Sequence, residues 1–133
     1  MNILGIDYGT KRIGVAVATG PLATPLGIIT NTVKSQTADV VSDHVINEIL
    51  SLINEYAIER IVVGISEGAM AEKSRAFIQA LASKTTIPIE EIDETLSSVQ
   101  AGEYQQSMKK SKRKGDRDHL AAAVILQDYL DLA

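Results

Sequence analysis

The pattern of apolar and polar positions divides the chain into three opening strands followed by alternating helices and strands. Three apolar segments, residues 2–7, 12–18 and 26–31, are separated by turn-rich connections, and the short first connection predicts an antiparallel hairpin. Between residues 37 and 57, apolar side chains recur at steps of three and four, which predicts a helix with one apolar stripe. The first half of the chain is therefore expected to form strands and a helix that can cover them.

Strands and helices alternate in the remainder of the chain. The continuous apolar run at residues 61–65 predicts a strand covered on both faces, and residues 87–92 predict a short strand in which Pro88 suits an edge position or strand entry. Helical spacing predicts three further helices, over residues 69–83, 95–108 and 118–131.

Together these elements predict one α/β domain over residues 1–133. A helix between two apolar strands implies a right-handed parallel crossover. We therefore expect a mixed five-stranded sheet, antiparallel in its three opening strands and parallel afterwards, with helices on both faces.

Composition excludes several kinds of site. The chain has no cysteine, which removes disulfides, thiolate chemistry and cysteine zinc sites, and its two histidines, His44 and His119, are too few for a histidine-rich metal centre. No run is long enough to span a membrane, and the N-terminus lacks the pattern of a signal peptide. We expect a soluble, cytoplasmic protein without a membrane partner.

Basic residues are concentrated in one segment of an otherwise acidic chain. The formal net charge is −4, yet residues 109–117 hold six of the 13 lysines and arginines and one acid, so this segment carries +5. A basic loop of this kind attracts a phosphate backbone, although a solvated loop without a ligand is the alternative. The residues we expect to bind nucleic acid there are Lys112, Arg113 and Lys114. A second phosphate site is predicted at the turn after the first strand, formed by Gly9, Lys11 and Arg12, whose two cations could equally be surface charges.

Acidic residues stand where the predicted strands end. Asp7 ends the first strand, Asp93 and Glu94 follow the strand at residues 87–92, Glu67 follows the strand at residues 61–65, and Asp118 opens the last helix. Each could be structural, for example a helix cap. In a sheet of this kind, however, ligands bind beyond the carboxyl ends of the parallel strands. Carboxylates that meet there repel one another unless they share a proton or a divalent cation lies between them. Oxygen ligands favour Mg²⁺ or Mn²⁺, and two such ions about 3.5–4 Å apart can direct water at a phosphodiester.

The order of these segments resembles the YqgF family, which is described as Holliday junction resolvases or pre-16S rRNA nucleases within the RNase H-like superfamily. The family's opening motif resembles residues 5–16, GIDYGTKRIGVA, and its central strand resembles residues 61–64, IVVG. Asp93-Glu94 resembles the start of its Asp-Glu-Arg-Leu-Thr/Ser-Thr motif, and its closing helix resembles residues 118–126, DHLAAAVIL.

The resemblance implies an RNase H-like fold and a divalent-metal-dependent endonuclease that cleaves structured nucleic acid, either branched DNA or an rRNA precursor. It implies Mg²⁺ or Mn²⁺ as cofactor and catalytic and metal-binding roles for Asp7, Glu94 and Asp118. Two positions depart from the family pattern. The Arg after Asp-Glu is Thr95 here, and the family's Pro-x-Asn-Met-Asp-Gly is replaced by SEGAM at residues 66–70, so that Glu67 could share or take over the role of Glu94.

Two other functions fit parts of the sequence. A nucleic-acid-binding module that keeps the fold without catalysis is one, because the motif Arg is lost. An actin-like or sugar-kinase-like ATPase is the other, because Asp-x-Gly-Thr at residues 7–10 also resembles a phosphate loop, but 133 residues supply at most one of the two domains that clamp a nucleotide there. The sequence leaves DNA or RNA, and monomer or homodimer, undecided.

Overall fold

A computed structural model describes residues 1–9, 11–31, 43–65, 68–93 and 114–132, with the backbone alone described at 114–119. The helices and strands follow one another as β1 (Ile3–Asp7), β2 (Arg12–Ala18), β3 (Ala23–Thr30), α1 (Asp43–Glu55), β4 (Arg60–Ile65), α2 (Ala69–Ala82), β5 (Ile89–Asp93) and α4 (Lys114–Leu132). No helix in the described ranges is long and apolar enough to cross a membrane.

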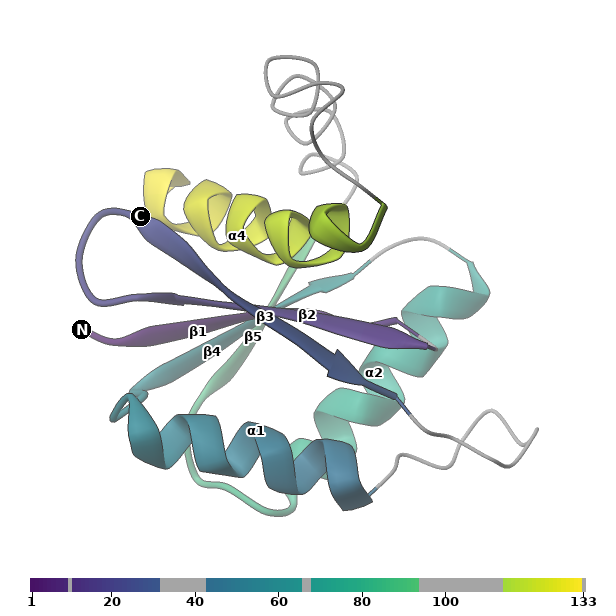
Figure 1. Ribbon diagram of the computed structural model, residues 1–133. Coiled ribbons are helices and arrows are strands. Elements are labelled where there is room, and N and C mark those ends of the chain that lie inside the picture. The colour runs from purple at the N-terminus through teal and green to yellow at the C-terminus, as the bar shows by residue number, and fades with distance from the viewer. Residues whose placement is uncertain (10, 32–42, 66–67, 94–113, 133) are drawn as a thin grey trace.

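The five strands form one mixed sheet in the order β3-β2-β1-β4-β5. β1 pairs with β2, and β2 with β3, in antiparallel fashion, whereas the β1–β4 and β4–β5 pairs are parallel. Figure 1 shows α4 on one face of this sheet and α1 and α2 on the other. The predicted α/β architecture, with five mixed strands and helices on both faces, is confirmed.

Several element boundaries differ from the prediction. α1 ends at Glu55 instead of residue 57 because Ala57 has a positive φ of 51° and the amide of Ile58 donates to the carbonyl of Ile53, which closes the helix end. β3 begins at Ala23, earlier than residue 26. The start of the predicted 37–57 helix and the whole predicted helix at 95–108 lie outside the described residues.

The last helix also begins earlier than predicted, at Lys114 instead of Asp118. The prediction followed apolar periodicity, which marks only the turns of a helix that pack against other elements. Residues 114–119 contain no large apolar side chain, so apolar periodicity could not predict a helix there. Part of the predicted basic loop is therefore helix, and Asp118 lies inside α4 and does not cap it.

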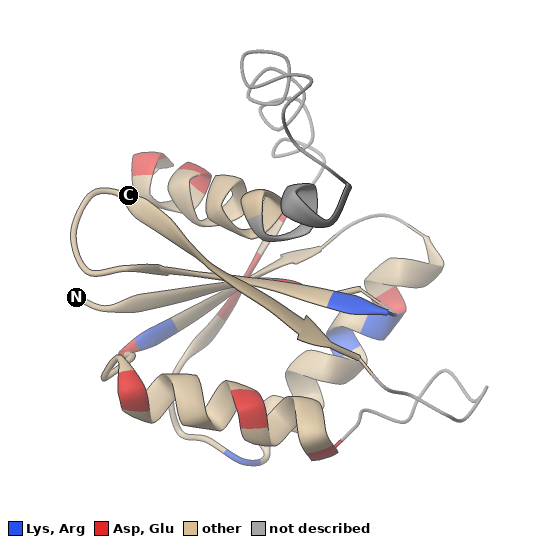
Figure 2. Ribbon diagram, in the orientation of Figure 1, with Lys and Arg blue, Asp and Glu red and all other residues tan. Residues whose placement is uncertain are grey.

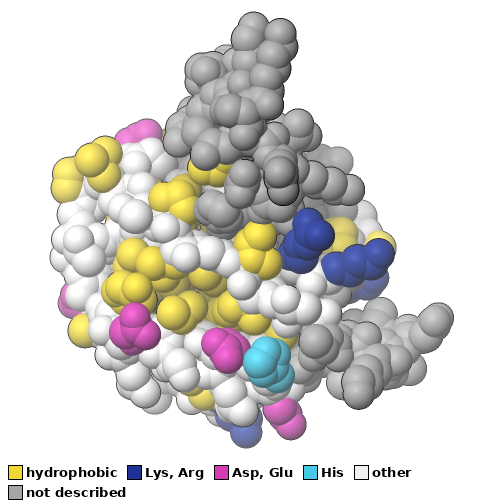
Figure 3. Space-filling model, viewed as in Figure 1, with side chains coloured by type: hydrophobic (Ala, Val, Ile, Leu, Met, Phe, Trp, Pro, Cys, Tyr) yellow, Lys and Arg dark blue, Asp and Glu magenta, His cyan; other side chains and the backbone are white. Residues whose placement is uncertain are grey.

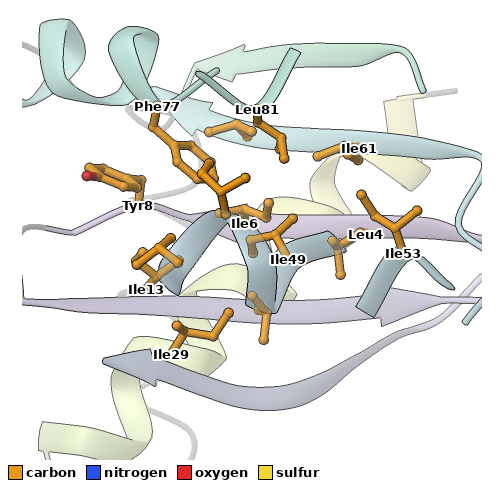
Figure 4. Close-up of a cluster of buried hydrophobic side chains, with 14 of the residues drawn as sticks. Leu4, Ile6, Tyr8, Ile13, Ile29, Ile49, Ile53, Ile61, Phe77 and Leu81 are labelled. Atoms are coloured by element: carbon orange, nitrogen blue, oxygen red, sulfur yellow. The ribbon is translucent and has the colours of Figure 1, made fainter. Parts of the chain in front are cut away.

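Strand alternation sorts the core into two clusters, one on each face. Leu4 and Ile6 of β1, and Tyr8 directly after it, belong to the larger cluster, which α1 and α2 cover (Figure 4). Ile3 belongs to the smaller cluster, which α4 covers. Because successive side chains of a strand point to opposite faces, Asp7 shares the α4 face with Ile3.

α4 packs closely on this face over two glycines of the strands. A Cβ on Gly5 would lie 2.8 Å from the Cβ of Leu126, and a Cβ on Gly64 would lie 2.5 Å from the Cδ1 of Ile125. Carbon atoms at such distances overlap. At Gly5 the nearest atoms are a Cβ and the backbone carbonyl of Ala122, so a larger residue there would push the helix from the sheet, whereas at Gly64 the nearest atom is the end of the Ile125 side chain. Gly5 therefore sets how closely α4 approaches β1.

The far end of α4 is held by a polar contact. The Nη1 of Arg60, at the start of β4, donates to the hydroxyl of Tyr129 at 2.6 Å. This hydrogen bond raises the pKa of Arg60, and the negative charge of Glu90, whose carboxylate lies 3.8 Å from Nη1, adds to the effect. The arginine stays charged, and its bond to Tyr129 fixes the position of α4 along the sheet.

Candidate active site

One edge of the sheet collects the carboxyl ends of its three parallel strands. In the register of β1 and β4, Asp7 stands beside Gly64, and in the register of β4 and β5, Ile65 stands beside Asp93. The last residues of β1, β4 and β5 therefore lie in one row. This is the edge at which α/β sheets of parallel strands bind ligands.

Asp7 lies in this row on the α4 face, between two glycines. Its antiparallel partner is Gly14 on β2 and its parallel partner is Gly64 on β4, and cross-strand partners point to the same face. Asp7 is half-buried, and neither flanking strand residue has a side chain that could cover it. The carboxylate is thus set at a strand end between two residues that have no side chain, and the Cδ1 of Ile125 lies over one of them, Gly64.

Asp93 belongs to the other face of the sheet. Its register partner Ile65 and its neighbour two residues back, Ile89, both pack in the cluster under α1 and α2. Ile92, by contrast, packs in the cluster under α4. Of the acidic pair at residues 93 and 94, Asp93 is therefore separated from Asp7 by the sheet, and Glu94 follows it outside the described residues.

α4 runs antiparallel to β1 and β4, so its beginning lies at the same edge as Asp7. Ala122 and Leu126 lie over Gly5, Ile125 lies over Gly64, and Tyr129 reaches Arg60 at the opposite end of β4. Figure 1 shows the same opposed directions of α4 and β1.

From these contacts the position of residue 118 follows. It precedes Ala122 by one helical turn, about 6 Å, and Asp7 follows Gly5 by two strand residues, about 6.6 Å. Both steps lead toward the same edge. The backbone of residue 118 therefore lies on the Asp7 side of the molecule, and the side chain of Asp118 lies outside the described structure.

The turn from β1 to β2 is tight and carries two exposed cations. A Cβ on Gly9 would lie 2.3 Å from the carbonyl oxygen of Arg12, so the turn closes only with glycine at this position. Lys11 and Arg12 are exposed. Figure 2 marks Lys and Arg positions in blue where β2 begins and in α2, and in Figure 3 a group of Lys and Arg side chains lies on the right of the face shown, with another at the bottom.

The remaining predicted site residues are less fully placed. Lys114 is the first residue of α4, and its side chain lies outside the described structure. Glu67, Glu94, Thr95, Lys112 and Arg113 also lie outside it. Within the residues that are described, no three His, Cys, Asp or Glu side chains form a group that could hold a metal ion; two of the three carboxylates predicted to do so are not among them.

Sequence reasoning missed a buried asparagine that supports the turn. Asn31 directly follows β3 and donates to the Gly9 carbonyl at 2.9 Å and to the Tyr8 hydroxyl at 3.2 Å. The ring of Tyr8 stacks on Phe77 of α2, with the centroids 4.7 Å apart (Figure 4). A polar residue at the end of an apolar strand was the only signal, and it is also typical of an ordinary turn.

Comparison with known proteins identifies the family. The family model described as RuvX, Holliday junction resolvase, matches residues 1–132. The chain belongs to the RuvX family. This confirms the resemblance to the YqgF proteins, which are the same family, and the match extends over all five strands and the helices between and after them.

Curated relatives of this RuvX-family chain carry the name of a nuclease. A protein of Desulforamulus reducens is 39% identical over 139 residues, which cover 98% of this chain and 97% of the relative. One of Syntrophus aciditrophicus is also 39% identical, over 98% of this chain and 89% of the relative. Both are named "Putative pre-16S rRNA nuclease". The RuvX chain is thus a member of a nuclease family.

Solved structures establish the fold class of the RuvX chain. Thermus thermophilus RuvC in complex with a Holliday junction substrate superposes with a TM-score of 0.67 at 16% identity, covering 100% of this chain and 97% of that one. The fowlpox virus Holliday junction resolvase gives 0.56 at 13% identity, with 100% of both chains covered. At these identities the likeness shows the fold, which is RNase H-like, as predicted.

Proposed function

We propose that the protein is a divalent-metal-dependent endonuclease that hydrolyses phosphodiester bonds in structured nucleic acid. The observation that supports this most is the position of Asp7. It is a strand-end carboxylate on the α4 face, flanked by Gly14 and Gly64, at the edge toward which α4 carries residue 118. Membership of the RuvX family makes a nuclease the function to test first.

The residues at this edge suit Mg²⁺ or Mn²⁺. Asp7, Glu94 and Asp118 would hold the ions, since carboxylate oxygens are the ligands that these hard cations prefer. Mg²⁺ loses water reluctantly, so such ions would keep several water ligands beside these carboxylates. When bound, such ions lower the pKa of a coordinated water and neutralise charge on the phosphate that is attacked.

The protein's own groups would bind and orient the nucleic acid. Lys11 and Arg12 are exposed beside Asp7, where they can bind a phosphate next to the scissile bond. Lys112, Arg113 and Lys114 would bind phosphates further along the backbone, since this segment is the most basic of the chain. Binding should therefore weaken steeply as salt increases.

The substrate is proposed from the named activities of similar proteins. The curated relatives are named for pre-16S rRNA and the structural neighbours for Holliday junctions. Both substrates offer an A-form or branched helix that a basic surface can bind by shape. We propose an rRNA precursor as the first substrate to test, because the relatives at 39% identity share far more sequence with this chain than the neighbours at 16%.

The test compares a 16S rRNA precursor and a four-way DNA junction in Mg²⁺, in Mn²⁺ and in EDTA. Cleavage that requires the cation and is lost in Asp118→Asn would support the proposal. Salt-sensitive binding of both substrates without cleavage in any divalent ion would instead identify a non-catalytic binding module that keeps the fold.

The second acidic ligand can be identified by a pair of matched variants. Glu94→Gln is expected to reduce cleavage by at least about tenfold, because the neutral amide is a weaker cation ligand. Glu67→Gln is expected to retain activity within about threefold. The measurement is the cleavage rate of each purified variant at saturating Mg²⁺. A larger loss of cleavage in Glu67→Gln than in Glu94→Gln would assign the metal-binding role to Glu67.

A further inference from the structure

Asn31 links the end of β3 to the turn between β1 and β2. It is 7% exposed, one of three buried polar or charged residues among those described. Its backbone amide donates to the carbonyl of Lys11 at 2.8 Å, which continues the β2–β3 ladder one residue beyond the pair of Arg12 and Thr30. Its side-chain amide reaches back across the turn to Tyr8 and Gly9.

These hydrogen bonds connect Asn31 to three residues at the turn. The Tyr8 hydroxyl, the Gly9 carbonyl and the Lys11 carbonyl each accept one hydrogen bond from Asn31. Tyr8 is itself held by its stacking on Phe77 of α2. The turn therefore depends on two elements distant in sequence, β3 and α2, for its conformation.

The burial of Asn31 is costly unless its amide group is needed. A buried side-chain amide loses its hydrogen bonds to water, and only the gain of equivalent bonds offsets this loss. The Nδ2 of Asn31 has two partners, but its Oδ1 has no hydrogen-bond partner within the described residues. An apolar residue would be buried at lower cost, but it could not donate to the Gly9 carbonyl and the Tyr8 hydroxyl.

We propose that Asn31 is a positioning residue that sets the phosphate-binding geometry of Gly9, Lys11 and Arg12. This inference rests on the proposed function of that turn. The turn leaves β1 at Asp7 and enters β2 at Arg12, so its shape affects where Lys11, and the Arg12 side chain at its end, lie relative to the Asp7 carboxylate. Groups that orient a reacting phosphate must be held within about 0.5 Å to act efficiently.

Asn2 offers a matched control at the opposite end of the sheet. Its Nδ2 also donates to two oxygens, the carbonyls of Tyr56 and Ala57, at 2.9 and 3.3 Å. Asn2→Ala and Asn31→Ala therefore delete the same group and a similar pair of hydrogen bonds. Only the second deletion touches the turn beside Asp7.

The experiment measures amide hydrogen exchange and binding of a four-way DNA junction in EDTA, over a range of salt concentrations. In Asn31→Ala, exchange at residues 8–12 is expected to accelerate at least about tenfold. The slope of log K against log salt is expected to fall by about one to two, as the ordered contacts of Lys11 and Arg12 are lost. Asn2→Ala should change neither quantity, although both variants lower the unfolding midpoint.

A second variant covers the case in which Asn31→Ala does not fold. Asn31→Asp keeps the shape but, when ionised, turns an acceptor toward the Gly9 carbonyl; when protonated, its hydroxyl can donate to the same oxygen. Burial raises the pKa of such a carboxyl. Protection of the turn in this variant should therefore recover at least about threefold as pH falls from 8 to 5, relative to the parent protein.

The two proposals fail in different ways. If the parent protein binds the junction but cleaves nothing, the nuclease proposal fails, while the exchange rates and salt slope still test Asn31. If Asn31→Ala leaves both quantities as they are in the parent protein and in Asn2→Ala, the positioning role is overturned, whatever the cleavage assays give.

Discussion

Replacing Asp7 with asparagine is expected to reduce divalent-dependent cleavage by at least about a hundredfold while the protein stays folded. The amide has the size and shape of the carboxylate but carries no charge, so it binds a hard cation weakly and cannot balance the charge of the ions. Asp7 is half-buried at a strand end, and its backbone is held by β2 and β4 on either side. Cleavage of the best substrate in Mg²⁺ gives the rate, and thermal unfolding monitored by circular dichroism checks the fold.

Asp93→Asn is the matched control for this experiment. Asp93 ends β5 at the same edge as Asp7, and the substitution changes the net charge equally, but its register partner Ile65 places it on the α1–α2 face. Cleavage should stay within about threefold of the parent rate. Equal losses of cleavage in the two variants would mean that the total charge at this edge matters and the position of the carboxylate does not. Full cleavage activity in Asp7→Asn would show that Asp7 has no role in the mechanism.

Gly5→Ala is expected to lower the free energy of unfolding by about 1–3 kcal/mol, the usual cost of overpacking a core. The new Cβ would meet the Cβ of Leu126 at 2.8 Å and the backbone carbonyl of Ala122 at 3.3 Å. Neither atom can rotate away, so α4 itself must move. Urea denaturation measures the loss, and Gly20→Ala, where the added Cβ meets nothing within 4 Å, should cost less than about 0.5 kcal/mol.

Gly64→Ala distinguishes a clash with a side chain from a clash with the helix backbone. Its Cβ would meet the Cδ1 of Ile125 at 2.5 Å, and the next contact is the Cγ1 at 3.2 Å. Ile125→Val removes the Cδ1 and should restore part of the stability lost in Gly64→Ala, which a double-mutant cycle detects as non-additivity. No single truncation of α4 to valine or alanine should rescue Gly5→Ala. Additive losses in the Gly64–Ile125 pair would contradict the close packing described for α4.

Cleavage by Gly5→Ala connects the packing of α4 with the proposed chemistry. The helix carries residue 118, so a displacement of α4 should separate Asp118 from Asp7. We expect activity to fall by more than the unfolded fraction explains. Normal cleavage activity of the folded fraction of Gly5→Ala would show that cleavage does not depend on the position of α4.

Local patterns in the sequence were enough to predict the strands and whether they run antiparallel or parallel. The runs at residues 3–6, 13–18 and 61–65 are apolar without interruption, because β1, β2 and β4 are the three inner strands and are covered on both faces. The short connection after Asp7 allowed only an antiparallel neighbour, and the helices before and after β4 implied parallel ones. Asp7 could be placed at a strand end because the apolar run stops just before it and a turn follows.

Long-range packing decided what the patterns could not. The face on which Asp7 lies follows from the register of β1 with β2 and β4, and the location of residue 118 follows from the direction of α4 across the sheet. The start of α4 at Lys114 could not be predicted, because the first residues of the helix include no large apolar side chain. The role of Asn31 depends on a turn 22 residues away, which no local window contains.

The sequence by itself determined which segments are strands and helices and which acids end them, because apolar periodicity and turn residues act over a few neighbours. Only the tertiary structure decided that Asp7 and Asp93 lie on opposite faces of the sheet and that the buried amide of Asn31 is hydrogen-bonded to the turn after Asp7. That information resides in strand register and in the close approach of α4 to Gly5 and Gly64, and both arise from contacts between residues far apart in the chain.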